Sequence, residues 1–300
     1  MKHSIIASIP LISFLGLIAC TGSSSPGTST GGSLDTGGAW GTGGSNAIVG
    51  GNGDNGGNAG SGGTAGTGGS MDCTGTQPSA MVTLPQGYGI DSTEVTRCQY
   101  KTWLDTNPST TGQDAWCAWN TDFMPNATCM SDSSVCQGAA CGNHPQVCVD
   151  WCDAYAYCKG VGKRLCGKIG GGANAPADFA DPTKDQWYNA CVSDDTNNAF
   201  PYGNTYDSKK CNGADEGIGT TVEVGSLPDC QSTVSGYAGV YDLFGNVWEW
   251  EDTCGGTSGP QDWCRERGGS FLTYSVHCDF TSHDARGNVV STVGFRCCAP

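Results

Sequence analysis

The sequence predicts an α+β domain with little regular secondary structure and many disulfide bonds. The 300 residues include 19 cysteines and 48 glycines, a composition typical of a cross-linked, loop-rich, exported chain. Segments with helical periodicity are few and short. Residues 245–250 read Gly-Asn and then Val-Trp-Glu-Trp, the pattern of a tight turn that leads into a half-buried strand.

The N-terminus carries an export signal. Residues 1–19 combine a short basic start, an apolar run from Ile5 to Ile18 and a small residue before Cys20. This ending resembles a bacterial lipobox, which implies cleavage before Cys20 and lipid attachment to its sulfur. Because Thr21 follows instead of Asp, the resemblance also implies sorting to the outer membrane. We therefore expect a lipoprotein of the bacterial cell envelope that its lipid holds on the membrane. The alternative is an ordinary signal peptide followed by an unrelated cysteine.

A composition change separates the rest of the chain into a tether and a domain. Residues 20–72 consist mostly of Gly, Ser, Thr, Asn and Ala and cannot bury enough apolar surface to fold, so they predict a flexible tether. A tether of this length has a mean reach of roughly 40 Å. Residues 73–300 are long enough for one sizeable core and are predicted to form one domain.

The net charge of the chain limits which classes of ligand are expected. The net charge is −15, and no basic stripe is present that could release counterions from a nucleic acid, so nucleic-acid binding is disfavoured. Cationic ligands or metal ions suit the charge better, although acidity also serves solubility alone.

The cysteine count predicts disulfides. With Cys20 reserved for a lipid, 18 cysteines remain, an even number that predicts nine disulfides in an oxidising compartment. Spacing does not determine how they connect. Each bond is expected to contribute about 2–4 kcal/mol by restricting the unfolded chain. Zinc binding by Cys148, Cys152 and Cys158 is disfavoured, because their spacing is poor and no histidine set accompanies them.

Short helices and strands are expected between the loops. A cap signal followed by apolar periodicity predicts a helix over 91–104. An apolar face, with Asp150 and Asp153 near the positive end of the helix dipole, predicts another over 149–160. A strand is expected near 247–250. Residues 105–147 form a long segment rich in Cys, Asn, Asp and Gly, in which Trp116, Trp119 and Phe123 are expected to build a small disulfide-pinned core. If these aromatic side chains were exposed together, they would instead mark a binding surface.

Several motifs in order carry a family resemblance. They are Glu94-Val-Thr, Asp150-Trp-Cys-Asp-Ala-Tyr-Ala-Tyr-Cys158, Gly162-Lys-Arg-Leu165, Tyr241-Asp-Leu-Phe-Gly-Asn-Val-Trp-Glu-Trp250, Arg267-Gly-Gly-Ser-Phe271 and Gly294-Phe-Arg-Cys297. This set resembles the formylglycine-generating enzyme family, also called the sulfatase-modifying factor domain, over most of residues 81–298. The resemblance implies that family's α+β fold, which is similar to C-type-lectin-like domains. It also implies opening strands near 81–85 and 88–91 and a short helix over 185–191. The chain departs from the family pattern after Leu165, where a Gly-, Ala- and Pro-rich loop replaces the expected Pro-Thr-Glu-Ala-Glu-Trp-Glu run.

The resemblance also implies one disulfide and two structural calcium sites. The disulfide joins Cys158 to Cys297. One calcium site would use the side chains of Asp242 and Glu249 with the carbonyls of Gly245 and Val247, and hard oxygen donors of this kind suit calcium. The other site maps less securely, onto Asn212, Gly213, Glu216 and Ile218. From the residues alone, Asp242 and Glu249 could equally be two surface acids on a solvated hairpin.

The catalytic site of the family is incomplete in this sequence. Formylglycine-generating enzymes hold Cu(I) between two cysteine thiolates, five residues apart, after Arg-Gly-Gly-Ser. The matching positions here are Thr273 and Cys278, and a neutral hydroxyl is a poor ligand for Cu(I). A disulfide could also consume Cys278. The oxidase interpretation would rely on Cys278 and Ser270, and a catalytic role for His277 and His283 beside Cys278 has little support. Arg286 is expected to order the core.

Two functional hypotheses follow. The first is a surface-tethered binding or structural module for an unknown protein or glycan, which has lost the copper site and uses calcium only as a structural ion. The second is a copper-dependent oxidase that converts a sulfatase cysteine to formylglycine. A sulfur-inserting iron enzyme on the same domain is a weaker third, because it needs a histidine triad and a helical partner domain that this chain lacks.

Overall fold

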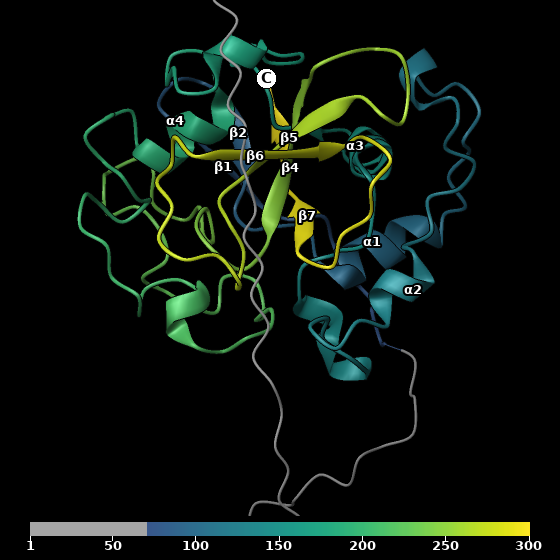
Figure 1. The fold of residues 1–300 in the computed structure, drawn as a ribbon, viewed down its shortest axis with the longest axis horizontal. Helices are drawn as coiled ribbons and strands as arrows, with labels where there is room; N and C mark the ends of the chain where they lie inside the picture. The colour runs from purple at the N-terminus through teal and green to yellow at the C-terminus, as the bar shows by residue number, and fades with distance from the viewer. Residues whose placement is uncertain (1–70) are drawn as a thin grey trace, which may run out of the picture. The chain divides into compact units, whose positions relative to one another are not determined.

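Two four-stranded sheets and four short α-helices form the part of the chain that the structure describes, residues 71–300 (Figure 1). The structure is a computed structural model. The predictions for the export signal, for lipidation of Cys20 and for nearly all of the tether lie outside the described residues.

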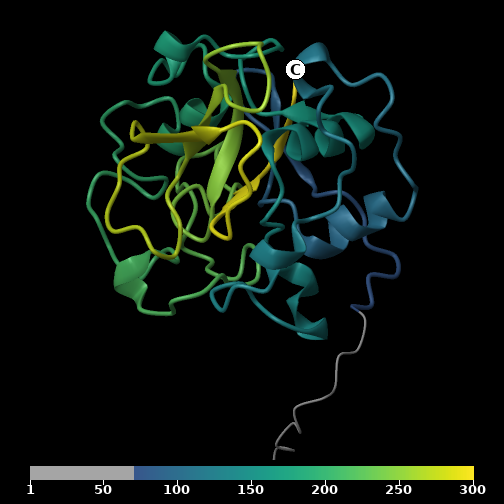
Figure 2. The ribbon, with the colours of Figure 1, turned by 45° about the vertical axis from the view of Figure 1, so that its right-hand side comes forward.

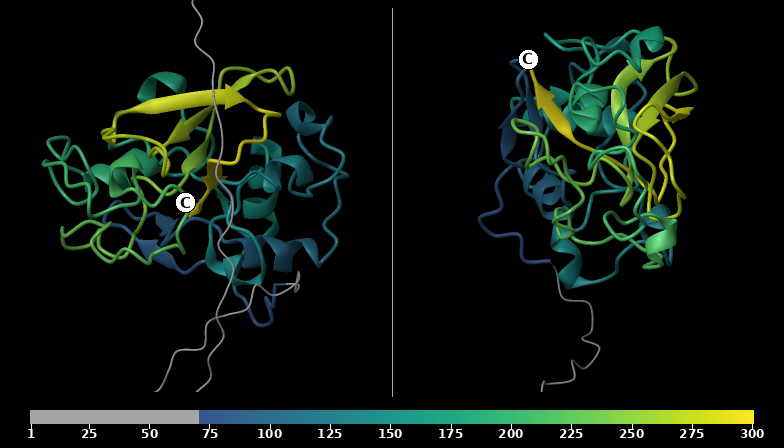
Figure 3. Two further views of the ribbon diagram at one scale, coloured as in Figure 1. Left: turned by 60° about the horizontal axis from the view of Figure 1, so that its bottom comes forward. Right: turned by 90° about the vertical axis from the view of Figure 1, so that its left-hand side faces the viewer.

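The helices are short, as expected. The α-helices are α1 (Arg97–Leu104), α2 (Ala127–Met130), α3 (Trp151–Gly160) and α4 (Gln186–Val192). Short 3-10 helices span Ala115–Cys117, Ala139–Asn143, Pro176–Asp178 and Ala214–Glu216. Loops connect these elements over most of the molecule, as the two views in Figure 3 show.

The two sheets share the C-terminal segment. The first sheet has the order β1-β2-β8-β3 and is antiparallel throughout; the second has the order β6-β5-β4-β7, in which only β4 and β7 are parallel. The strands are β1 (Met81–Thr83), β2 (Gly89–Asp91), β3 (Arg164–Leu165), β4 (Trp248–Cys254), β5 (Trp263–Arg267), β6 (Thr281–Ala285), β7 (Val293–Phe295) and β8 (Cys297–Ala299). Because β7 and β8 are separated by a single residue, this segment joins both sheets.

Reciprocal capping boxes determine where two of the helices begin. The helix expected over 91–104 starts only at Arg97, because Asp91 belongs to β2 and Thr96 and Gln99 form a reciprocal capping box. At the start of α3, Asp150 and Asp153 form a second capping box. The prediction for this helix was therefore correct to within two residues at its start.

An aromatic cluster forms the core between α1, α3 and β7. The rings of Tyr100 and Tyr157 lie 5.5 Å apart, and Phe295 packs edge-on against both. Figure 2 shows helices α1 to α3, in blue and teal, gathered on one side of strands β4 to β7. The 105–147 segment extends this core, because Phe123 is buried in it, Trp116 and Trp119 pack against it, and the Cys117–Cys152 disulfide ties the segment to α3.

All 18 cysteines of the described chain pair into nine disulfides. The pairs are Cys73–Cys98, Cys117–Cys152, Cys129–Cys148, Cys136–Cys141, Cys158–Cys297, Cys166–Cys298, Cys191–Cys278, Cys211–Cys230 and Cys254–Cys264. The Cys158–Cys297 pair is the one that the family resemblance implied. The three cysteines considered for zinc belong to three different disulfides. A domain bridged in this way belongs in an oxidising compartment, as expected of an exported protein.

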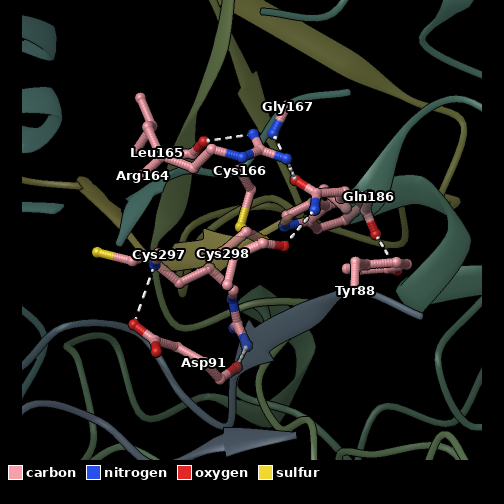
Figure 4. Close-up of a disulfide and its surroundings, with 12 residues drawn as sticks. Tyr88, Asp91, Arg164, Leu165, Cys166, Gly167, Gln186, Cys297 and Cys298 are labelled. Carbon is pink, nitrogen blue, oxygen red and sulfur yellow. Dashed lines mark hydrogen bonds between the residues drawn. A yellow bond between two sulfur atoms is a disulfide. The ribbon is translucent and has the colours of Figure 1, made fainter. Parts of the chain in front are cut away.

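The adjacent cysteines Cys297 and Cys298 connect β8 to the structure on both of its sides. Figure 4 shows the Cys166–Cys298 disulfide, beside which Arg164 donates a hydrogen bond to the side chain of Gln186. On the other side, the Cys297 N–H donates to the Asp91 carboxylate at 3.0 Å. Disulfides thus join β8 to α3 through Cys158 and to the residue that follows β3 through Cys166.

Candidate functional site

The Gly-Asn turn before β4 positions the first group of candidate residues. Gly245 and Asn246 have φ values of 79° and 56°, so the prediction of a positive-φ turn is confirmed. A Cβ atom on Gly245 would lie only 2.4 Å from the Asn212 carbonyl oxygen, and the Asn246 N–H donates to that oxygen at 2.8 Å. A glycine is therefore required where the two loops meet.

The acids on either side of this turn are buried. Asp242 and Glu249 are each 1 % exposed, so their interpretation as two surface acids on a solvated hairpin is wrong. Arg296 donates two hydrogen bonds to Glu249, of 2.6 and 2.7 Å, and the Trp187 indole N–H donates a third of 2.9 Å. Glu249 is thus neutralised and hydrogen-bonded inside the protein.

Glu94 completes a buried acidic cluster with Asp242 and Glu249. Asn246 donates to Glu94 Oε1 at 3.0 Å, whereas Glu94 Oε2 has no hydrogen-bond partner among the described residues. Burial, together with the neighbouring Asp242 charge, raises the pKa of Glu94 well above its usual range. Burial likewise raises the pKa of Asp242 to about 6. Sequence analysis identified the Glu94 motif but gave this residue no role.

The residues expected to bind calcium fit a hard cation in part. Three carboxyl groups face one guanidinium, so the cluster carries excess negative charge when its acids are ionised, and one Glu94 oxygen is unpaired. Both Glu249 oxygens, however, are already occupied by Arg296 and Trp187. Among the described residues, no group of three or more His, Cys, Asp or Glu side chains is arranged to hold a metal ion. A calcium ion here would therefore depend on Asp242 and on the Gly245 and Val247 carbonyls.

The residues of the less secure calcium site are directed elsewhere. Asn212 is buried and donates to the Thr220 carbonyl and to Asn246. The Glu216 carboxylate pairs with Lys209 at 3.1 Å. Gly213 precedes the 3-10 helix at 214–216, and Ile218 is an exposed side chain.

The segment that matches the copper site has a structural role. Cys278 is bonded to Cys191, the sixth residue of α4. The Thr273 hydroxyl accepts a hydrogen bond from the Ser270 N–H at 3.0 Å and lies 3.3 Å from the Ser270 hydroxyl. The Thr273 N–H donates in turn to the Ser270 carbonyl at 2.8 Å. These positions supply a closed turn and a disulfide, and they do not fit a two-thiolate Cu(I) site.

The nearby histidines do not form a catalytic pair. Because Cys278 is in a disulfide, it cannot act as the nucleophile of a Cys-His pair. His277 packs against Phe200 and His283 against Trp263. Arg286 is buried and pairs with Asp262 at 2.8 Å, in agreement with its expected role in ordering the core.

Large apolar side chains are exposed around the same segment. Leu272, Tyr274 and Phe280 are 57, 69 and 49 % exposed, which sets them apart from the buried core. The Phe280 ring lies 6.1 Å from that of Trp248, at the start of β4. Sequence analysis missed this surface, because exposure depends on which loops fold over a residue.

One known protein family matches most of the chain. The family model for the sulfatase-modifying factor enzyme 1-like domain matches residues 47–299. The chain belongs to this family. The α+β, disulfide-rich fold described above is accordingly the fold expected for the family.

Its curated relatives within the family include active and inactive members. The chain is 30 % identical over 200 residues to the formylglycine-generating enzyme of Mus musculus, which covers 56 % of this chain and 46 % of the relative. It is 28 % identical over 172 residues to the inactive C-alpha-formylglycine-generating enzyme 2 of the same organism, covering 51 and 48 %. It is also 28 % identical over 186 residues to the Thermomonospora curvata formylglycine-generating enzyme, covering 52 and 56 %. The chain thus spans about half the length of the curated relatives it matches.

Solved structures with some similarity include that of CarF, which has a TM-score of 0.48 and 21 % identity, with 71 % of this chain and 86 % of that one covered. PvdO from Pseudomonas aeruginosa gives a TM-score of 0.46 and 19 % identity, with 70 and 79 % covered. Among the helices within residues 71–300, none is long and apolar enough to cross a membrane.

Proposed function

We propose that this chain is an exported, lipid-anchored module of the family that binds a partner and has no oxidase activity. The observation that carries the proposal is the Cys191–Cys278 disulfide, together with the engagement of Thr273 by Ser270. The oxidation of a cysteine by copper requires a metal that is open to a substrate thiolate. With one position bridged and the other a bonded hydroxyl, the chain offers no soft ligand pair for Cu(I). The relative named an inactive enzyme supports the view that the domain also serves without this chemistry.

The N-terminal segment supports attachment to the outside of a cell membrane. A lipid on Cys20 and the tether that follows would hold the domain near the membrane of the bacterial envelope and leave its surface free to bind. One acyl-bearing residue with several chains anchors a protein more stably than a single chain does. The nine disulfides are suited to that oxidising location.

The exposed apolar surface at residues 272–280 is the docking site that we propose for a protein partner. Leu272, Tyr274 and Phe280 together expose apolar area beside the lost catalytic turn, and tyrosine is favoured at interface centres. Asp279, which is also exposed, adds a negative charge to the rim. The partner we expect therefore presents apolar side chains together with basic groups.

Calcium is proposed as a structural ion of the same domain. Asp242 with the Gly245 and Val247 carbonyls would hold it, next to the unpaired oxygen of Glu94. The ion would offset the negative charge that Arg296 leaves uncompensated in the buried cluster. It would hold the Gly-Asn turn against β4, and it takes no part in any reaction.

A thiol count combined with a copper titration tests this function. The full-length protein, unfolded without reductant, is expected to show no free thiol and, when folded, to bind no Cu(I) in competition with a Cu(I) chelator. It should also leave a Cys-x-Pro-x-Arg peptide unchanged in air. A free thiol at Cys278 with one equivalent of bound Cu(I) and turnover of the peptide would establish the oxidase instead. For docking, Tyr274→Ala should release a partner captured from the outer surface, whereas Thr233→Ala, on an exposed loop elsewhere, should retain it.

A further inference from the structure

A buried carboxyl group without a counter-ion lies beside the exposed apolar surface at residues 272–280. The side chain of Glu266, on β5, is 5 % exposed, and its Oε1 atom has no hydrogen-bond partner among the described residues. None of the ion pairs within residues 71–300 includes this acid. An ionised carboxylate in this position has lost its hydration without gaining a cation, so it calls for a positively charged group from outside the described chain.

The register of the second sheet places two aromatic rings next to this carboxyl group. Glu266 pairs with Trp250 on β4 and with Ser282 on β6, so the three side chains share one face of the sheet. Trp248 and Phe280 each lie two residues before one of these partners and therefore on the same face. Their ring centroids are 6.1 Å apart. Diagonal neighbours in a sheet are within reach of aromatic side chains, so Glu266 lies beside the Trp248–Phe280 pair.

The aromatic pair is open to solvent, in contrast to the core on the same face. Phe280 is 49 % exposed and Trp248 is partly exposed, whereas Trp250 is buried. β6 forms the edge of the sheet, and no further strand of the described chain pairs with its outer side. Ser282, the β6 neighbour of Glu266, is also partly exposed. The carboxyl group of Glu266 therefore lies directly below a partly open surface instead of deep in the core.

The charge on this face is negative. Asp284 lies two residues after the β6 partner of Glu266 and thus on the same face. Burial, reinforced by the Asp284 charge, raises the pKa of Glu266 to about 7, and Asp279 adds a further acid at the exposed start of β6. Arg265 and Arg267 alternate to the opposite face of β5, where Arg267 stacks on rings of α4. The negative charge of this face therefore suits a cationic group.

A carboxylate beside aromatic rings is an environment that suits an arginine side chain. A guanidinium group stacks on aromatic faces and donates hydrogen bonds to a carboxylate from a planar fork. It is also more weakly hydrated than an ammonium group, so it is transferred more readily to a carboxyl group below the surface. A neutral or acidic group would leave the charge of Glu266 uncompensated.

We propose that the partner bound at the exposed apolar surface at residues 272–280 places an arginine side chain against Trp248 and Phe280 and pairs it with Glu266. The inference rests on the function proposed above, since it assigns the contact that selects the partner at the proposed docking site. Leu272 and Tyr274 supply apolar area, and the arginine contact supplies specificity. A protein with apolar anchors and no arginine beside them leaves the carboxyl group unpaired and is bound less tightly.

Two short peptides added to the full-length protein test the inference. The probes are acetyl-Leu-Arg-Leu amide and the same peptide with citrulline in place of arginine, which keeps the shape of the side chain and removes its charge. The readouts are the indole N–H resonance of Trp248, assigned with Trp248→Phe, and the dissociation constant from its titration at pH 8. The arginine peptide should shift this resonance and bind about tenfold or more tightly than the citrulline peptide.

Glu266→Gln is the decisive variant, because glutamine keeps the shape of the side chain and cannot ionise. It should weaken binding of the arginine peptide about tenfold or more, to the level of the citrulline peptide. Asp229→Asn, which removes one acid from an exposed position elsewhere, should leave binding unchanged. In the unaltered protein, binding of the arginine peptide should also weaken as the pH falls from 8 to 5.5, since a protonated carboxyl group offers no charge to the guanidinium. Glu266→Gln should lack this dependence.

Three results would overturn the inference. Neither peptide binds, or the arginine and citrulline peptides bind the unaltered protein equally, or Glu266→Gln binds the arginine peptide as tightly as the unaltered protein does. A melting temperature of Glu266→Gln at pH 8 that is no lower than that of the unaltered protein shows that the variant is folded. The outcome is separable from the test of the proposed function. If both peptides bind equally and Tyr274→Ala weakens both, the docking surface is retained and only the arginine contact is lost.

Discussion

A buried glutamate on β5 should make the domain more stable in mild acid than in mild base. Glu266 is 5 % exposed, and its Oε1 atom has no hydrogen-bond partner among the described residues. Burial, reinforced by the nearby Asp284 charge, raises the pKa of this carboxyl from 4.5 to about 7. The folded protein therefore holds a proton that the unfolded chain releases between about pH 4.5 and 7. Because the folded state binds more protons there, its stability falls as the pH rises through this range.

The size of the stability loss follows from the pKa shift of Glu266. A difference of about 2.5 pKa units at about 1.4 kcal/mol per unit corresponds to about 3 kcal/mol of stability, fully lost above about pH 7. Glu266→Gln keeps the shape of the side chain without an ionisable group. The variant should match the unaltered protein near pH 4 and exceed its stability by about 3 kcal/mol at pH 8.

Guanidinium unfolding without reductant, from pH 4 to 8, measures this difference. Asp229→Asn serves as the control, because it removes one acid from an exposed position. Burial also raises the pKa of Asp252 to about 7. Acids of this kind add the same pH dependence to the stability of all three proteins. Parallel stability curves of Glu266→Gln and the unaltered protein from pH 4 to 8 would refute a raised pKa at Glu266.

Three further outcomes are expected. Arg296→Met leaves the Glu249 charge buried without its cation and should cost about 3–5 kcal/mol in guanidinium unfolding. Lys101→Met, which breaks an exposed pair, should cost less than about 1 kcal/mol. Removing calcium with a chelator should lower the melting temperature of the unaltered protein by several degrees, an effect of about 1–2 kcal/mol. Asp242→Asn should abolish this response to calcium. An equal response in both proteins would disprove Asp242 as a calcium ligand. The double variant Thr273→Cys with Cys191→Ala places a second thiol near a freed one and should gain one equivalent of Cu(I) in a chelator competition, whereas Thr273→Cys alone should gain none.

The motifs predicted the fold because they mark positions where backbone geometry permits few residues. The Gly-Asn turn needs two residues that tolerate positive φ, and the structure has both there. Asp150 and Asp153 predicted the first turn of α3, because acids suit the positive end of the helix dipole, and in the structure they also form its capping box. Local chemistry of this kind can be recognised without knowledge of the rest of the chain.

The candidate site could not be predicted as well, because its state depends on residues distant in sequence. Asp242 and Glu249 carried equal arguments for a surface hairpin and for a metal site. In the folded protein Glu249 pairs with Arg296 and Asp242 lies near Glu94, and these two partners lie 47 residues after and 155 residues before Glu249. The disulfide partner of Cys278 was equally open, because spacing does not encode connectivity.

The missing copper ligand and the disulfide at Cys278 are two separate obstacles to oxidase chemistry. Restoring a thiol at position 273 would remove the hydroxyl that accepts from Ser270, but Cys278 would still be bonded to Cys191. Freeing Cys278 alone would leave one thiolate opposite a hydroxyl, which is too few soft donors for Cu(I). An exported domain also meets an oxidising environment, in which Cys191 and Cys278, placed for a bond, will pair. A catalytic site would therefore require at least two coordinated changes, whereas a binding surface on the same scaffold requires neither, and this favours recognition as the role of the present chain.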